Sequence, residues 1–211
     1  MRRPPSNKPL ARRLSRLRGV RPFGGAAFGV ILGVMAIDDL QPGFPDAAEY
    51  PAFVAGYIGL TEGVTHPVVQ MEQQGAAFAG WCEGLDAARR SYRYEPGKWS
   101  IQQMLGHITD TERVFAYRAL RIARGDQSLN PPFEQDDWVV AAAHDDAPWA
   151  DLVDEFRHVR GSTVLLLRHL PAGAWMKQGE VRGGAVTVRA LAHAILGHLE
   201  HHRAVLRDRY L

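Results

Sequence analysis

The sequence predicts an all-α protein, an antiparallel four-helix bundle with an additional short helix. Apolar residues recur at helical spacing over several long segments, and Pro and Gly residues separate these segments. No segment shows the clean alternation of apolar and polar residues that marks a half-buried strand. Four amphipathic helices bury their apolar faces by packing against one another. With 211 residues and 46% hydrophobic content, the chain can bury one sizeable core.

The first two predicted helices follow a turn-rich lead-in, QPGFPDAAEYP (residues 41–51). A short helix is expected over Tyr50–Leu60 and a longer one from Val68 to about Leu85. The apolar positions of the longer segment have the spacing of a core-facing stripe: Val69, Met71, Phe78, Trp81 and Leu85. Cys82, the only cysteine, lies in this helix, where we expect an inert, half-buried thiol. A single cysteine excludes an intramolecular disulfide framework and a Cys-rich zinc site.

The third predicted helix begins after RYEPGKWS (residues 93–100). Ser100 can cap its first turn, and Gln103 stands at the position that completes a capping box. The helix is expected to run to about Arg124, where Gly125 can end it. One face carries Ile101, Met104, Ile108, Thr111, Phe115 and Ile122.

Two further helices complete the predicted bundle. One begins at or just after Pro148 and runs to Leu170, with Pro171 beyond its end. Residues 172–186 contain four glycines and can form either a loop or a small hairpin. Thr187 can then cap the last helix, which is expected over residues 188–209.

Charge is distributed unevenly along the chain. Residues 1–21 carry eight Lys or Arg side chains and no acid, although the whole chain has a formal net charge of only +2. Removing those eight from the 25 basic residues leaves 17 against 23 acidic ones, so the remainder has a net charge of −6. A nucleic-acid partner would depend on the basic segment alone, and we predict none.

Residues 1–36 are expected to lie apart from the bundle, as a basic and apolar N-terminal extension to a domain of residues 37–211. The run PFGGAAFGVILGVMAI (residues 22–37) is uncharged and too short and Gly-rich for a spanning helix. Three interpretations stay open: a signal peptide ending near Ala36, a basic surface or weakly anchored segment, or upstream sequence read in frame before a start at Met35. We favour the last, which predicts a cytoplasmic protein; a signal peptide would predict export.

The last helix carries histidines where apolar residues are expected. Its inward stripe contains His198 and His202 beside five other members: Val188, Leu191, Ile195, Val205 and Arg209. The two histidines are four residues apart, so their imidazoles lie one turn apart on one face and can hold a divalent cation together. Two other histidines, His193 and His201, lie off this stripe and are expected to be solvated.

A third ligand has to come from another helix. His107 lies at the edge of the apolar stripe of the helix that begins after Ser100, and a bundle can bring it to face the histidine pair. Inward histidines are also common as hydrogen-bonded structural groups. The residues alone leave both interpretations open.

The chain resembles the DinB-like (DinB/YfiT-like) superfamily of four-helix putative metalloenzymes. The resemblance covers about residues 47–211 and rests on two motifs, YEPGKWSIQQMLGHITDTERVFAYRALRIARGD and ALAHAILGHLEHHRAVLRDRYL, and on the order and spacing of the helices. Carried over to this chain, it implies a metal site formed by His107, His198 and His202. Three imidazoles leave a coordination position open, as in catalytic zinc sites.

The resemblance implies a divalent-metal-dependent enzyme that acts on a small molecule. Zinc is the first expectation, and nickel, manganese and iron also accept imidazole ligands. The reaction is either thiol-dependent S-transfer, with a low-molecular-weight thiol of the bacillithiol or mycothiol type, or hydrolysis. A non-catalytic, stress-related metal- or ligand-binding bundle is the alternative. The resemblance also implies a homodimer, and no membrane span is expected in the body of the protein.

Two arginines are further candidates for the site. Arg160 interrupts an otherwise apolar stripe, where a charge is costly unless it is paired or binds an anion. It can bind a carboxylate of the substrate or thiol, or it can pair with Asp110 or Glu112 inside the bundle. Arg118 lies on the same side of its helix as His107 and has the same two interpretations. Asp110 is a candidate acceptor that orients a ligand histidine.

Overall fold

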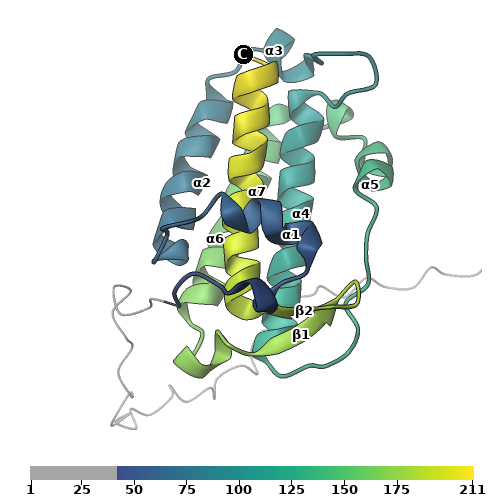
Figure 1. Cartoon of the computed structure of the whole chain (residues 1–211). Coiled ribbons are helices and arrows are strands. Elements are labelled where there is room, and N and C mark those ends of the chain that lie inside the picture. The colour runs from purple at the N-terminus through teal and green to yellow at the C-terminus, as the bar shows by residue number, and fades with distance from the viewer. Residues whose placement is uncertain (1–41) are drawn as a thin grey trace, which may run out of the picture. The chain divides into compact units, whose positions relative to one another are not determined.

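The computed structural model describes residues 42–211, and within them four long helices form a bundle. These helices lie side by side in Figure 1: α2 (Pro67–Glu83), α4 (Ile101–Ala123), α6 (Trp149–Arg168) and α7 (Val188–Arg209). The predicted all-α four-helix bundle is confirmed. The predicted N-terminal extension, residues 1–36, lies outside the described residues. None of the described helices is long and apolar enough to cross a membrane.

Shorter elements surround the four helices. The short helix expected near residues 50–60 is α1 (Ala52–Gly59), which lies across α7 (Figure 1). The sequence did not lead us to expect α3 (Ala87–Ser91) or α5 (Gln135–Ala142). The described residues also contain three single turns of 3-10 helix: η3 (Ala47–Glu49), η4 (His144–Asp146) and η5 (Ala172–Ala174).

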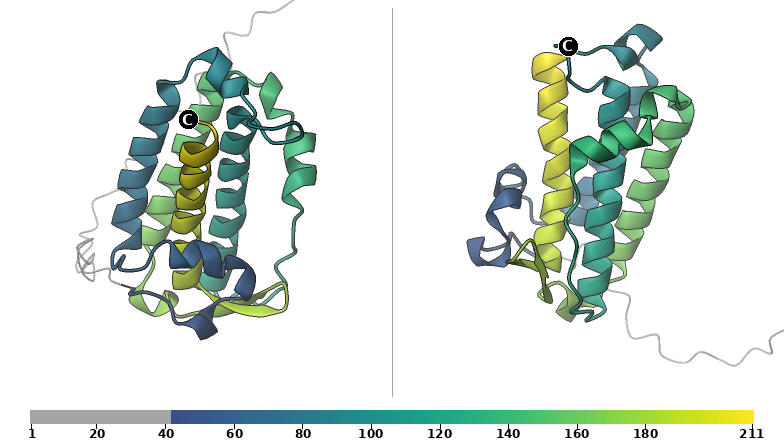
Figure 2. Two further views of the ribbon diagram at one scale, coloured as in Figure 1. Left: turned by 45° about the horizontal axis from the view of Figure 1, so that its top comes forward. Right: turned by 90° about the vertical axis from the view of Figure 1, so that its right-hand side faces the viewer.

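Hydrogen bonds near the helix ends give the directions of the four helices. Trp149 at the start of α6 donates to the carbonyl of Cys82 at the end of α2, so these helices are antiparallel. Tyr210, just after α7, donates to the carbonyl of Trp99, just before α4, so this pair is also antiparallel. The connection from α4 to α6 carries α5 along the outside of α4 (Figure 2) and returns to the end of the bundle at which α4 begins. As a result α4 and α6 run in the same direction.

The predicted helix boundaries follow local side-chain chemistry. Ser100 accepts from the backbone N–H of Gln103, and the Gln103 side chain accepts from the N–H of Ser100, which confirms the capping box. Gly125 follows α4 with a φ of +85°, a conformation that costs little for glycine. Thr187 caps α7 by accepting from the N–H of Ala190 at 3.1 Å.

Residues 178–187 form a β-hairpin, one of the two structures that the glycine-rich segment allows. Strand β1 (Gln178–Val181) pairs antiparallel with β2 (Gly184–Thr187), and Val181 lies opposite Gly184. Arg182 and Gly183 form the two-residue turn, with φ values of 51° and 76°. This geometry matches the twist of a hairpin, although a non-glycine residue rarely adopts it.

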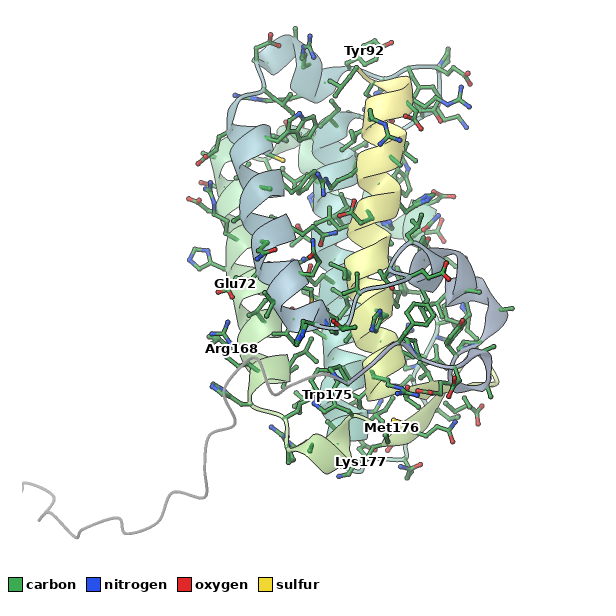
Figure 3. The ribbon with its side chains drawn as sticks, turned by 60° about the vertical axis from the view of Figure 1, so that its left-hand side comes forward. Glu72, Tyr92, Arg168, Trp175, Met176 and Lys177 are labelled. Atoms are coloured by element: carbon green, nitrogen blue, oxygen red, sulfur yellow. The ribbon has the colours of Figure 1, made fainter. Side chains whose placement is uncertain are left out.

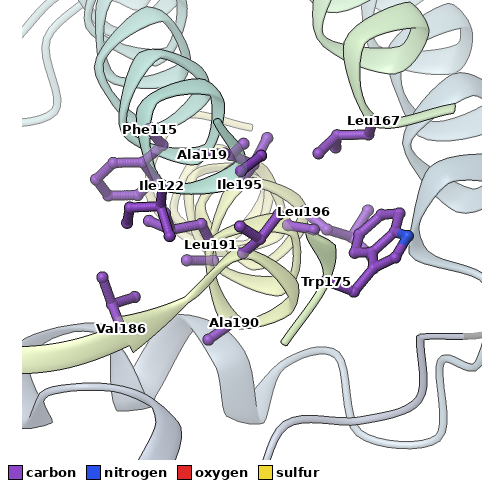
Figure 4. Close-up of a cluster of buried hydrophobic side chains, with 14 of the residues drawn as sticks. Phe115, Ala119, Ile122, Leu167, Trp175, Val186, Ala190, Leu191, Ile195 and Leu196 are labelled. Atoms are coloured by element: carbon purple, nitrogen blue, oxygen red, sulfur yellow. The ribbon is translucent and has the colours of Figure 1, made fainter. Parts of the chain in front are cut away.

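Buried apolar side chains form two clusters, one toward each end of the bundle. The cluster next to the hairpin includes Phe115, Leu167, Trp175 and Leu196 (Figure 4). The cluster at the other end includes Phe78, Ile108, Phe156 and Leu199. Cys82 belongs to this second cluster and is fully buried, which corrects the expected half-buried position; burial raises the pKa of its thiol to about 12.

A polar layer separates the two clusters at the middle of the bundle. Its members include a buried polar residue from every long helix: Gln74, Glu112, Arg160 and His198. At the surface, by contrast, α2 and α6 are bridged by an exposed ion pair between Glu72 and Arg168, with 2.9 Å between Oε2 and Nη2 (Figure 3). The polar layer places the candidate metal histidines inside the bundle and not at one of its ends.

Candidate metal centre

Three histidine side chains from two helices meet in the bundle. Nε2 of His198 lies 3.2 Å from Nε2 of His107 and 3.1 Å from Nε2 of His202. Each ring offers one potential ligand atom, and all three atoms lie within 4.8 Å of one another. The side chains are 3%, 4% and 7% exposed for His107, His198 and His202. The three residues predicted from the sequence are therefore brought together.

Two glycines allow neighbouring elements to approach the cluster closely. Gly197 precedes His198, and a Cβ atom there would overlap with the backbone carbonyl of Tyr57 in α1. Gly106 precedes His107, and a Cβ atom there would overlap with the ring of His144. Because α1 can pack directly on α7, the Tyr57 ring lies edge-on against His198, with 5.1 Å between ring centroids. The repeated Leu-Gly-His sequence thus has a packing reason in both helices.

The cluster fits a tetrahedral divalent cation. Two nitrogens that bind one zinc ion at about 2.05 Å and the tetrahedral angle lie about 3.3 Å apart. The two shortest separations, 3.1 and 3.2 Å, are close to this value. One imidazole nitrogen offers either one proton or one lone pair. Nε2 of His198 therefore cannot form a good hydrogen bond to both neighbouring Nε2 atoms. A shared cation could bind the lone pairs of all three.

The protein favours the neutral form of all three imidazoles. Burial lowers the pKa of His107 to about 4. For His198 and His202 burial is again the largest cause, and the neighbouring histidines lower the pKa further, well below the ordinary value. Neutral imidazole is the form that binds metal, so the lone pairs are available at pH 7.

The outer contacts of the cluster differ from the expected arrangement. Asp110, the candidate acceptor, accepts from Arg113 at 3.1 Å and lies 3.6 Å from Nε2 of His144. It makes no hydrogen bond to His107 among the described residues. Nδ1 of His202 is buried and has no hydrogen-bond partner in residues 42–211. Packing against rings, including Trp99 at 4.7 Å from His107, is what holds the imidazoles in place.

Two chambers open onto the cluster from different sides. The His198 chamber, of about 480 Å³, is lined by residues that include Tyr57, Thr111, Phe115, Arg118, Phe133 and Arg182. The His202 chamber, of about 590 Å³, is lined by residues that include Arg93, Tyr94, Lys98, Trp99, His201 and Tyr210. Asp136 at the start of α5 borders both. Both volumes lie in the usual range for small-molecule sites.

The remaining histidines of α7 have separate positions. His193 is fully buried, which corrects the expected solvated position: its Nδ1 lies 2.7 Å from Oγ1 of Thr61, and its Nε2 lies 3.2 Å from the carbonyl of Gly43. It holds the lead-in segment against the bundle. His201 is half-buried at the His202 chamber, with its ring 5.0 Å from that of His202.

The two candidate arginines are equally buried, each 4% exposed, but their surroundings differ. Arg160 donates to both carboxylate oxygens of Glu112, and its Nη1 donates to the side chain of Gln74 and the carbonyl of Met71. This is the pairing with Glu112 that the sequence left as an alternative, and a catalytic role for Arg160 stays a prediction. Arg118 has no such partner among residues 42–211: its Nη2 donates to the carbonyl of Pro131 at 2.7 Å.

Sequence reasoning missed several residues that line the chambers. Tyr57 comes from α1, and Arg182 comes from the hairpin turn that follows α6. Thr111 was expected on the apolar face of its helix, and its buried Oγ1 has no hydrogen-bond partner within residues 42–211. The one signal in the sequence for Tyr57 is Gly197, because a glycine inside a helix can indicate the close approach of another element. It does not say which residue approaches.

Comparisons with known proteins agree with this architecture. The family model described as the DinB superfamily matches residues 70–206. Among solved structures, the chain is similar to YfiT from Bacillus subtilis, with a TM-score of 0.62 and 16% sequence identity over 67% of this chain and 82% of that one. YfiT is described as a probable metal-dependent hydrolase with an unusual four-helix bundle topology. No curated protein matches the chain.

Proposed function

The chain belongs to the DinB superfamily, and on that premise we propose that it is a divalent-metal-dependent enzyme acting on a small molecule. The observation that carries the proposal is the convergence of three buried Nε2 atoms, from His107, His198 and His202, beside two chambers. A closed structural site would surround the cation with four protein ligands. Three ligands beside open chambers leave room for a substrate.

The donor set decides which ions fit. Neutral imidazole suits zinc, nickel and iron better than manganese, which prefers oxygen ligands, and zinc is the first choice because it accepts three nitrogen ligands and one exchangeable ligand. When bound, such a cation supplies Lewis acidity that lowers the pKa of a water or thiol toward neutrality. The chain holds the three imidazoles neutral, packs them against rings and leaves each of them no more than 7% exposed.

Hydrolysis is the reaction that we place first. The related fold of YfiT is described as a probable metal-dependent hydrolase, which supports the same chemistry here. Water can reach the His202 chamber, whose walls carry the polar side chains of Arg93, Lys98 and His201. A substrate bound in the His198 chamber would then lie next to a different histidine of the cluster from this water.

Thiol-dependent S-transfer is the second candidate, because two chambers border one cluster. One chamber can receive the electrophile and the other a low-molecular-weight thiol of the bacillithiol or mycothiol type. Lys98 of the His202 chamber suits a carboxylate of such a thiol, whereas Arg93 is already paired with Asp145. A non-catalytic, stress-related metal-binding bundle is the third reading, and it predicts no turnover.

One experiment separates these functions. The protein is stripped of metal with a chelator, reloaded separately with zinc, nickel, manganese or iron, and assayed on a panel of activated esters and amides. A parallel panel pairs a generic electrophile with bacillithiol, mycothiol or glutathione. We expect metal-dependent turnover on the first panel. Turnover that requires a thiol would instead establish S-transfer, and no turnover with any metal would favour the non-catalytic bundle.

Variants tie the activity to the cluster. His107→Ala removes the ligand that comes from α4 and should abolish the metal-dependent turnover. His158→Ala is the matched control, since this histidine is exposed on α6 and hydrogen-bonds to the carbonyl of Asp154. Equal rates for His107→Ala and the parent protein would contradict the proposed site.

A further inference from the structure

We infer that the His198 chamber is a carboxylate-binding subsite, in which Arg118 binds the carboxylate of a substrate whose apolar part lies among aromatic side chains. The inference names a substrate class for the proposed enzyme. It rests on the proposed function only in that the bound substrate would react next to His198. The binding itself depends on residues outside the three-histidine cluster. It can therefore be tested on protein that holds no metal.

The contrast between two buried arginines is the first argument. Arg160 and Arg118 are each 4% exposed. Arg160 is neutralised by buried Glu112, with 2.7 Å between Nη2 and Oε2. Arg118 has one hydrogen bond, to the carbonyl of Pro131, and no carboxylate within ion-pair distance among the described residues. A buried guanidinium without a counter-ion is costly, and an anionic ligand would remove that cost.

The chamber adds a second positive charge near its mouth. Arg182 stands at the hairpin turn with a φ of 51° and donates to the carbonyl of Phe133 at 3.1 Å. Its charge and, to a larger extent, burial lower the pKa of Arg118 to about 10. A non-glycine residue in this backbone region carries strain, which is common where a side chain has to be held for function. Arg182 is itself paired with the exposed Glu134, so Arg118 is the cation of this chamber that has no carboxylate partner among residues 42–211.

The acidic residues that line the chamber are all exposed. Glu134 is paired with Arg182 at 3.2 Å, and Asp136 and Asp137 are exposed. Their charges are largely screened by water, whereas the charge of Arg118 is not. Arg118 is therefore the only buried charge among the residues that line the chamber.

Aromatic rings provide the walls for the apolar part of a ligand. The guanidinium of Arg118 lies 5.8 Å from the ring centre of Phe115 and 5.9 Å from that of Phe133. Both rings hold its planar group in one orientation, which suits a bidentate carboxylate. Tyr57 closes the side of the chamber that faces His198.

One face of α4 leads from the metal cluster to Arg118. His107, Thr111 and Arg118 are spaced by four and seven residues and share this face. The Thr111 hydroxyl is buried, has no hydrogen-bond partner in the described region, and is available to a ligand. Eleven residues of helix span about 16 Å between the Cα atoms of His107 and Arg118, and both side chains shorten the gap. The expected substrate is an arylalkyl or similar apolar carboxylate whose reacting group lies several bonds from the carboxylate.

Calorimetric titration of the metal-free protein tests the inference. The probes are 4-phenylbutyrate, its neutral analogue 4-phenylbutyramide, and phenyl phosphate. We expect the carboxylate to bind at least about tenfold more tightly than the amide, because a charge-assisted pair is lost in the amide. Equal binding of acid and amide would overturn the inference, as would tighter binding of phenyl phosphate than of 4-phenylbutyrate.

Variants assign the binding to Arg118. Arg118→Gln should weaken the affinity for 4-phenylbutyrate by about tenfold or more. Arg118→Lys should recover part of the loss, because it keeps the positive charge but cannot donate the two parallel hydrogen bonds of a guanidinium. Arg168→Gln, which removes a cation of the surface pair with Glu72, should leave the affinity unchanged. Unchanged binding by a folded Arg118→Gln protein would contradict the assignment.

The same proteins separate this inference from the proposed function. If Arg118-dependent carboxylate binding is observed but no divalent metal binds, the subsite stands and the proposed metal-dependent enzyme fails. If metal binds in wild type and in Arg118→Gln alike while neither acid nor amide is preferred, the subsite fails and the metal centre stands.

Discussion

Arg160 and Glu112 form a two-pronged ion pair in the middle of the bundle, with 2.9 Å from Nε to Oε1 and 2.7 Å from Nη2 to Oε2. Gln74 accepts from the same guanidinium and donates to the carbonyl of Leu196, two residues before His198. One chain of hydrogen bonds therefore joins all four long helices. It fixes the position of α7 along its neighbours, and with it the position of His198.

Glu112→Gln should destabilise the protein strongly. The substitution leaves the charge of Arg160 buried without its carboxylate, which typically costs about 3–5 kcal/mol of unfolding free energy. Urea denaturation followed by circular dichroism measures the loss. The control is Glu155→Gln, which breaks a half-exposed pair with Arg113 and should cost no more than about 1 kcal/mol. Similar losses in the two variants would show that the buried pair has no special role.

Gly197→Ala should disturb the contact of α1 with α7. The added methyl group meets the carbonyl of Tyr57, which is backbone and cannot rotate away, so overpacking should cost about 1–3 kcal/mol. The matched control is Gly161→Ala on α6, where an added Cβ meets nothing within 4 Å. That change should stabilise the helix by about 0.5–1 kcal/mol. Thermal unfolding should show a lower melting temperature for Gly197→Ala and a higher one for Gly161→Ala. A stabilised Gly197→Ala protein would contradict the close approach of α1 to α7.

His193 should make stability depend on acid pH. Burial lowers its pKa from 6.5 to about 4, so between these values the unfolded chain binds a proton that the folded protein does not. The stabilisation is thus complete above pH 6.5 and is lost as pH falls toward about 4, by up to about 1.4 kcal/mol per pH unit. His193→Gln should reduce the slope of unfolding free energy in this interval, measured in metal-free buffer. The exposed His158→Gln should keep the parental slope, and equal slopes for all three proteins would argue against a neutral buried His193.

Much of the fold follows from local signals in the sequence. The capping box at Ser100 and Gln103, the cap at Thr187 and the glycine after α4 each act within one helical turn, so their consequences can be read directly. The sequence left the hairpin as one of two options. Its strands are only four residues long, and its turn places Arg182, a residue that does not favour a positive φ, in that conformation. Helix α5 lies in a long crossover whose path depends on packing against α4.

The candidate site was predictable to the extent that one helix defines it. His198 and His202 are one turn apart, and this spacing alone puts them on one face. Their meeting with His107 depends on how α4 and α7 are aligned, and the polar layer fixes that alignment. In the sequence only the family resemblance indicated His107 as the third ligand. Within the described part of the chain Arg160 has a carboxylate partner and Arg118 has none, a difference that the sequence could not give because both arginines occupy the same kind of position.

The most direct test of the account is the metal content of single histidine variants. Inductively coupled plasma mass spectrometry of the purified proteins, after incubation with zinc and removal of free ions, counts the ions per chain. We predict about one ion in the parent protein and a loss in each of His107→Ala, His198→Ala and His202→Ala. His201→Ala, which changes the neighbouring histidine outside the cluster, should keep its ion. Unchanged metal content in the three cluster variants would contradict the metal centre on which the proposed function rests.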